Sequence, residues 1–173
     1  MKKTRWAGAA VTALITLTGC TTPTGDVAAV VSGIELTGAQ LETANQAYAR
    51  IAGVDAAQTR ATVLSVLIRG EVANVLMARH GITITAAERE RVIASDPDLT
   101  RLAQDPAVRT LVEDAVDINL VGDAVGRPQV LAEAVAIPIV VNPRYGGWST
   151  ANFTLDPELS ALARPATSPA PSR

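Results

Sequence analysis

A continuous apolar stripe in the middle of the chain constrains the fold more than any other feature of the sequence. Its members recur every three or four residues, so they lie on one face of an α-helix, and that face must be buried against other elements. Asp55 and Gln58 precede the stripe with the spacing of a capping pair, and Gly81 follows it as a helix stop. The sequence therefore predicts a long core helix that ends at Gly81. The stripe consists of Leu64, Leu67, Ile68, Val72, Val75 and Leu76.

Further start signals divide the rest of the chain into helices. Thr37 with Gln40, and Thr85 with Glu88, have the spacing of a capping box. Two Asp-Pro pairs each offer an N-cap followed by proline at the first helical position. Together these signals predict helices over 38–52, over 85–95, from residue 97, over 106–126, and briefly after residue 128.

Short β-branched segments lie near both ends of the chain body. Residues 26–36 read DVAAVVSGIEL, in which Ser32-Gly33 suits a tight hairpin turn. Residues 135–141 read VAIPIVV, and Pro138 restricts that strand to a sheet edge or a break. A lone hairpin is only marginally stable, so we expect the later strand to pair with Val27–Val31. The predicted fold class is mainly α with a small β element (α+β), in which a short sheet joins the N- and C-terminal segments.

The N-terminus has the layout of a secretory signal. Basic residues at positions 2, 3 and 5 precede an apolar stretch from Ala7 to Leu17. That stretch is too short to cross a bilayer core, which takes roughly 20 helical residues. Leu17-Thr18-Gly19-Cys20 resembles the bacterial lipobox, in which the cysteine receives a diacylglyceryl group and signal peptidase cuts before it.

The lipobox resemblance implies a signal peptide over 1–19, lipidation at Cys20 and a lipidated linker over 20–25. Two acyl chains meet the requirement for stable anchoring in a bilayer. We therefore expect the protein on the extracytoplasmic face of the cell membrane, held there by its lipid. The alternative is an ordinary secretory signal whose cysteine is incidental.

The charge balance excludes several classes of partner. The chain has 15 basic and 17 acidic residues, and three of the basic ones lie in the first five positions. The remainder contains no lysine and no basic block, so we expect no nucleic acid as a partner. One cysteine and one histidine do not make a structural zinc site, and we expect no metal and no cofactor.

No pattern of side chains in the sequence indicates an enzyme. His80 ends the predicted core helix without a nucleophile motif, and we expect a structural or capping role for it. Glu113 and Asp114 are adjacent and diverge on a helix, so we assign them to a solvated face, together with Glu88–Arg91. Arginines spread along the helices with acids between them predict a salt-bridged surface. We expect no catalytic residues.

The order of these elements resembles the N-terminal domain of SurA-type envelope chaperones. The resemblance rests on VAAVVSGIELTGAQL at 27–41 and on a long helix ending in MARHGITITAAERERV at 77–92. The segment 141–148 is similar to the tail of actinobacterial SurA-like lipoproteins. The resemblance implies a helical SurA N-terminal-like domain over 26–163, without the parvulin domain that carries isomerase activity. Residues 164–173 are rich in proline and serine, which predicts a disordered tail.

Tyr145 and Trp148 are the candidate contacts for a peptide or partner. They lie close together beside a Pro/Gly turn in a chain that has only 3% aromatic residues. Tyrosine and tryptophan are enriched at protein interfaces, where one part of the ring is buried and another part contacts water. The alternative is that both rings fold back over the small sheet as a lid on its core.

Two functions follow from these features. A lipid-anchored protein of this kind could bind unfolded or extended secreted polypeptides in a helix-lined groove, as a chaperone does. It could instead present the same fold to one dedicated envelope protein, through an edge strand or its tail. The sequence offers no set of residues that would support an enzymatic activity.

Lipidation at Cys20 is directly testable. Mass spectrometry of the mature protein should find a diacylglyceryl group on Cys20 at the new N-terminus, and Cys20→Ala should release or mislocalise the protein. A mature terminus elsewhere with an unmodified thiol would contradict the prediction.

Overall fold

The computed structural model of the chain describes residues 25–156 and residue 159. The predicted signal peptide, Cys20, nearly all of the linker and the predicted tail over 164–173 lie outside the described residues. The helices are α1 (Gly38–Ala52), α2 (Ala56–His80), α3 (Ala86–Ser95), α4 (Pro97–Ala103), α5 (Pro106–Val125) and α6 (Arg127–Ala134), with a 3₁₀ turn η1 at Pro143–Tyr145. The strands are β1 (Val27–Val31), β2 (Ile34–Thr37), β3 (Ile139–Val141), β4 (Gly147–Ser149) and β5 (Thr154–Asp156). The predicted class, mainly α with a small β element, is confirmed.

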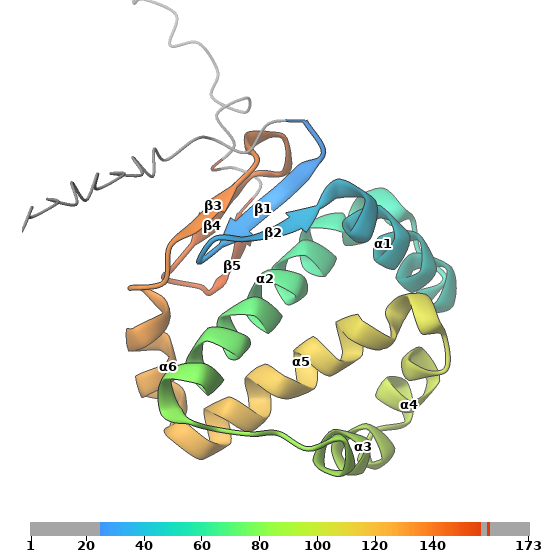
Figure 1. Cartoon of the computed structure of the whole chain (residues 1–173). Coiled ribbons are helices and arrows are strands. Elements are labelled where there is room, and N and C mark those ends of the chain that lie inside the picture. The colour runs from blue at the N-terminus through green and yellow to red at the C-terminus, as the bar shows by residue number, and fades with distance from the viewer. Residues whose placement is uncertain (1–24, 157–158, 160–173) are drawn as a thin grey trace, which may run out of the picture.

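Helix α2 lies at the centre of the fold. It packs against α1 and α5, and it also contacts β1, β2, β5 and α6. The strands gather on one side of α2, and α3 and α4 lie beyond α5 on the other (Figure 1). Among the described residues, α2 is the one helix that is long and apolar enough to span a membrane. Half of its most apolar window is nevertheless buried inside the fold. Its contacts are those of a core helix.

The helix ends follow the predicted caps. Thr37 with Gln40 and Thr85 with Glu88 both form complete capping boxes. At the start of α2 the bonding differs, because the Asp55 side chain accepts from the Ala57 amide at 2.7 Å and does not form the reciprocal pair with Gln58. The two Asp-Pro pairs open α4 and α5 as expected.

The sheet joins the two ends of the domain. Its order is β2-β1-β3, with β1 antiparallel to both neighbours, and Val31 opposes Ile139. The predicted pairing of the two segments is therefore confirmed. The predicted extent of the second strand is wrong, because residues 135–137 form a turn and a bend after α6 and the strand itself spans only Ile139–Val141. The β4–β5 hairpin was not predicted at all.

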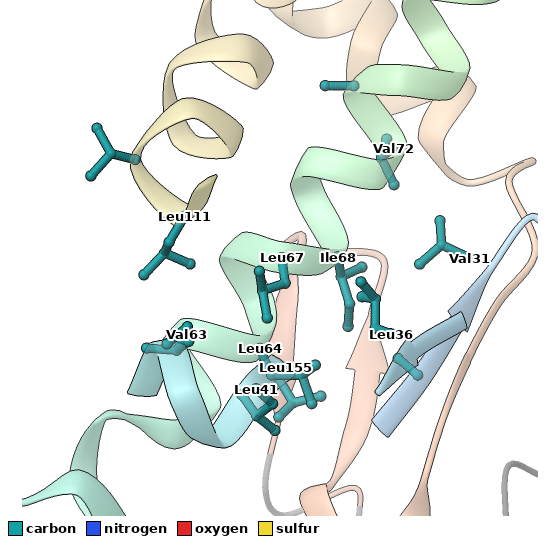
Figure 2. Close-up of a cluster of buried hydrophobic side chains, with 14 of the residues drawn as sticks. Val31, Leu36, Leu41, Val63, Leu64, Leu67, Ile68, Val72, Leu111 and Leu155 are labelled. Atoms are coloured by element: carbon teal, nitrogen blue, oxygen red, sulfur yellow. The ribbon is translucent and has the colours of Figure 1, made fainter. Parts of the chain in front are cut away.

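A single apolar core surrounds α2. Figure 2 draws side chains of α2 between those of the sheet, α1 and α5, with Ile68 and Val72 on the side of Val31 and Leu36. Burying a large apolar side chain contributes about 1.5–3 kcal/mol, so this cluster is the main source of stability. The fully buried large side chains include Leu41, Leu64, Ile68, Leu76, Val31, Val63, Val72, Val108, Val116 and Val121.

The contact between α2 and α5 contains a half-buried carboxyl group, that of Asp114. A Cβ at Gly70 would lie 2.3 Å from the Asp114 Cγ, so glycine is required for the two helices to meet here. Burial, and then the negative charges of Glu71, Asp117 and Glu113, raise the pKa of Asp114 from 3.8 to about 7. The expectation that Asp114 belongs to a solvated face is wrong, because the α5 face that it occupies turns toward α2.

Two neighbours of Asp114 form an ion pair that ties α3 to α5. Arg89 donates from Nε and Nη2 to the two carboxylate oxygens of Asp117, at 2.6 and 2.7 Å. The Asp117 side chain is buried, and its hydrogen bond raises the pKa of Arg89. Bidentate pairs of this geometry are the strong ones. The salt-bridged surface predicted for the other arginines is found where Arg50 meets Asp105 and Arg101 meets Asp98.

Protonation of Asp114 should be coupled to folding. The folded-state pKa lies above that of an unfolded aspartate, so the free energy of unfolding should fall as the pH rises from about 4 through about 7. Asp114→Asn should remove this decline and raise the free energy of unfolding at pH 8, by up to about 4 kcal/mol. Urea unfolding across that pH range measures both effects. Asp123→Asn, an exposed change on the same helix, is the matched control. Identical pH profiles for the two variants would contradict this account of Asp114.

Candidate functional site

The β4–β5 hairpin lies against α2 and separates two pockets. The α2 residues that line these pockets fall on both sides of Ser65, which contacts β5. One pocket is bordered by Arg60 and Ala61, and the other by Val66 and Arg69. The hairpin therefore decides the shape of both cavities.

Ser65 anchors the hairpin to the helix. Its Oγ accepts a hydrogen bond from the Leu155 amide at 2.9 Å and donates to the Ala61 carbonyl one turn earlier at 2.8 Å. The Thr154 hydroxyl lies 3.2 Å from the same oxygen. Ser65 is 1% exposed, so these bonds form out of reach of solvent. A serine in the middle of an apolar helix thus gives β5 a fixed position.

The first cavity, called here the arginine pocket, has a volume of about 530 Å³. Its polar groups come from α1, α2 and η1, and its apolar wall includes Ala61 and Leu155. It contains Tyr145, one of the two predicted contact residues. The lining residues are Gly38, Glu42, Ala57, Arg60, Ala61, Arg144, Tyr145 and Leu155.

The second cavity, called here the apolar pocket, has a volume of about 260 Å³ and lies between α2, α5, α6 and the hairpin loop. Arg69 is part of its lining and donates from Nε to the Ser65 carbonyl, and burial lowers the pKa of its guanidinium. The lining residues are Val66, Arg69, Ala115, Ile118, Asn119, Gly122, Arg127, Val130, Leu131 and Phe153.

Phe153 reaches the apolar pocket from a strained backbone. Its φ is 51°, in the left-handed region that bulky residues rarely adopt. Such a conformation costs about 1–3 kcal/mol and persists only where the surrounding structure enforces it. Here the ring is packed against the core and against Trp148, which offsets that cost.

Trp148 occupies a different environment from Tyr145. Its ring meets Phe153 edge to face, with the centroids 5.4 Å apart and the planes at 75°. The indole Nε1 is buried without a hydrogen bond in the described part of the chain. The rings of Tyr145 and Trp148 both pack against the core, but Tyr145 lines the arginine pocket and Trp148 lines neither this pocket nor the apolar pocket. The two predicted contact residues are thus close in sequence without forming one site.

Most residues of the pockets were missed in the sequence, among them Arg60, Arg144 and Phe153. Arg144 and Phe153 belong to turns whose conformation depends on contacts with distant helices. In the sequence, the spacing and neighbours of Arg60 do not distinguish it from the other arginines along the helices. The one usable signal was that Arg144 precedes Tyr145 in the turn already singled out.

His80 and Glu133 form a structural pair. His80 Nε2 lies 3.0 Å from the Glu133 Oε2, which links the end of α2 to α6. Hydrogen bonds from Gln129 and then His80 lower the pKa of Glu133. Within residues 25–156 and 159, no group of three or more His, Cys, Asp or Glu side chains has the placement to hold a metal ion.

No family model, curated protein or solved structure matches this chain.

The Ser65 anchor predicts a local change in stability. Ser65→Ala leaves the buried Leu155 amide without an acceptor, which should lower the free energy of unfolding by about 1–3 kcal/mol. Hydrogen exchange at the Leu155 amide should accelerate more than exchange in α5. Ser95→Ala is the control, because the Ser95 hydroxyl bonds the Val92 carbonyl at an exposed helix end. Equal effects of both variants, with unchanged Leu155 exchange, would rule out the anchor.

Proposed function

We propose that this protein is a membrane-anchored extracytoplasmic lipoprotein that binds unfolded secreted polypeptides as a chaperone does, without isomerase activity. The observation that carries the proposal is the apolar pocket and the exposed apolar side chains beside it. Leu131 lines the pocket and is 47% exposed, and Val135, one turn further on, is 61% exposed. Apolar groups left in water next to a concave site are typical of interaction surfaces.

The composition of the apolar pocket supports an unfolded chain as its occupant. Aliphatic side chains and Phe153 form most of its wall, while Asn119 and two arginines supply polar groups at a few points. Each apolar side chain that a client buries contributes about 1.5–3 kcal/mol. A cavity this small therefore supports weak, reversible contacts that depend on apolar character more than on one sequence.

The anchor is the second part of the proposal. Lipidation at Cys20 would hold the domain at the membrane where newly secreted chains emerge. Holding an unfolded chain needs only apolar surface and reversible contact. We therefore propose a passive activity that needs no nucleotide.

Binding to one dedicated envelope protein is the alternative. The sheet supports it, because β2 and β3 are its two edges, and Ile34 on β2 is 53% exposed. A partner strand added at such an edge would gain main-chain hydrogen bonds and side-chain specificity.

An aggregation assay tests the leading proposal. The full chain in lipid nanodiscs should reduce light scattering by several unrelated unfolded proteins, relative to empty nanodiscs. Leu131→Asp combined with Val135→Asp should abolish most of this effect, because the charges would have to be buried with the client. Val54→Asp is the matched control, since Val54 is also exposed but lies at the end of α1 away from the pocket.

Suppression of one protein only, found by crosslinking in the living envelope, would favour the dedicated partner. No suppression of any client would overturn chaperone-like binding. In parallel, a proline-limited refolding reaction should run at its uncatalysed rate, and acceleration would contradict the absence of isomerase activity.

A further inference from the structure

Two hydrogen-bond donors converge in the arginine pocket. A Cβ at Gly38 would lie 3.1 Å from the Arg144 Nη2 and 3.4 Å from the Tyr145 hydroxyl oxygen, so both groups lie next to the same point. The Arg144 Cζ stacks 4.6 Å from the centroid of the Tyr145 ring. Stacking of this kind holds a guanidinium plane in place, so less freedom is lost when a ligand binds.

Arg60 adds a second positive charge that is only loosely neutralised. Its Nη2 lies 3.4 Å from the Glu42 Oε2, whereas a tight charge-assisted bond measures about 2.7–2.9 Å. The other Glu42 oxygen accepts from the Gln46 amide at 2.8 Å. The Arg60 and Glu42 side chains are 41% and 42% exposed, which leaves both accessible from solvent. Arg60 therefore retains donors for an incoming acceptor.

The rest of the pocket wall is apolar and the rest of the protein is acidic. Ala57, Ala61 and Leu155 complete the lining, and charged hydrogen bonds beside such groups are stronger than in open water. The chain as a whole has a net charge of −2, so the two arginines form a local positive site and not part of a basic surface. One compact anion with an apolar neighbour fits this combination better than a row of phosphates.

We propose that the arginine pocket binds a carboxylate of the captured polypeptide, either an acidic side chain or the free C-terminus. The inference rests on the proposed function, because it assigns part of the bound chain to a second site. Arg144 and Arg60 supply the charge, the Tyr145 hydroxyl donates a hydrogen bond, and Glu42 competes with the ligand for Arg60.

A small probe tests the pocket separately from chaperone activity. N-acetyl-leucine carries a carboxylate and one apolar side chain, and N-acetyl-leucinamide is its uncharged counterpart. Added to the full chain in nanodiscs labelled with ¹⁵N, the acid should shift the resonances of Gly38 and of the Arg60 and Arg144 side chains. The acid should bind about tenfold or more tightly than the amide, as expected for one charge-assisted hydrogen bond.

Substitutions in the arginine pocket should change the affinity for the acid in opposite directions, depending on the charge removed. Arg144→Gln and Arg60→Gln should each weaken binding of the acid by about tenfold without affecting the amide. Glu42→Gln should strengthen it, because the competing carboxylate is removed. Arg101→Gln is the matched control, since it removes the same charge from an exposed position on α4. Circular dichroism verifies that each variant is folded.

Labelled peptides of leucine, alanine and serine identify the source of the carboxylate. One pair differs only in a free or amidated C-terminus, and a second, amidated pair differs only in an internal glutamate or glutamine. Preference for the charged member of either pair, lost in Arg144→Gln, supports the proposal and names the source.

Equal binding of acid and amide, or pocket variants that behave like Arg101→Gln, would overturn the carboxylate site while leaving chaperone-like binding intact. Binding of N-acetyl-leucine without any peptide binding or suppression of aggregation would instead overturn the proposed function and the polypeptide as the source of the carboxylate.

Discussion

The burial of α2 on more than one side is the interaction on which the rest of the structure depends. Ile68 and Val72 lie toward the sheet, while other side chains of the helix meet α1 and α5. Because α2 contacts the sheet, α1 and α5 at once, it sets the positions of elements that are far apart in the sequence. The N-terminal hairpin, the C-terminal strands and α5 all take their places from this one helix.

The close approach of α2 and α5 has an electrostatic cost. Gly70 lets the helices meet, and the space is filled by Asp114, whose pKa is raised to about 7 by burial and neighbouring acids. Arg89 is engaged by Asp117 and only partly offsets those charges. The contact between α2 and α5 therefore contains a group that is most compatible with folding when it is neutral.

The two pockets result from the way in which the C-terminal segment returns to α2. Ser65 holds β5, so the hairpin covers the middle of the helix and leaves a cavity on each side. Each is lined by two arginines, but the wall of one is mostly apolar, whereas in the other the arginines lie beside the Tyr145 hydroxyl. Their different chemistry is the basis for proposing that a single extended chain offers an apolar side chain to one and a carboxylate to the other.

Local signals in the sequence determined the helices and their caps, because capping residues and apolar periodicity act over a few residues. The pairing of Val27–Val31 with the later strand followed from a different constraint, since a lone hairpin is only marginally stable. Only the tertiary structure decided the β4–β5 hairpin, the partial burial of Asp114 and the placement of Arg60 and Arg144 in one pocket. The hairpin strands are three residues each, too short for a periodic signal, and they depend on contact with Ser65. Whether an acid is solvated or an arginine lines a pocket depends on which helix face meets another, and that is settled by long-range packing.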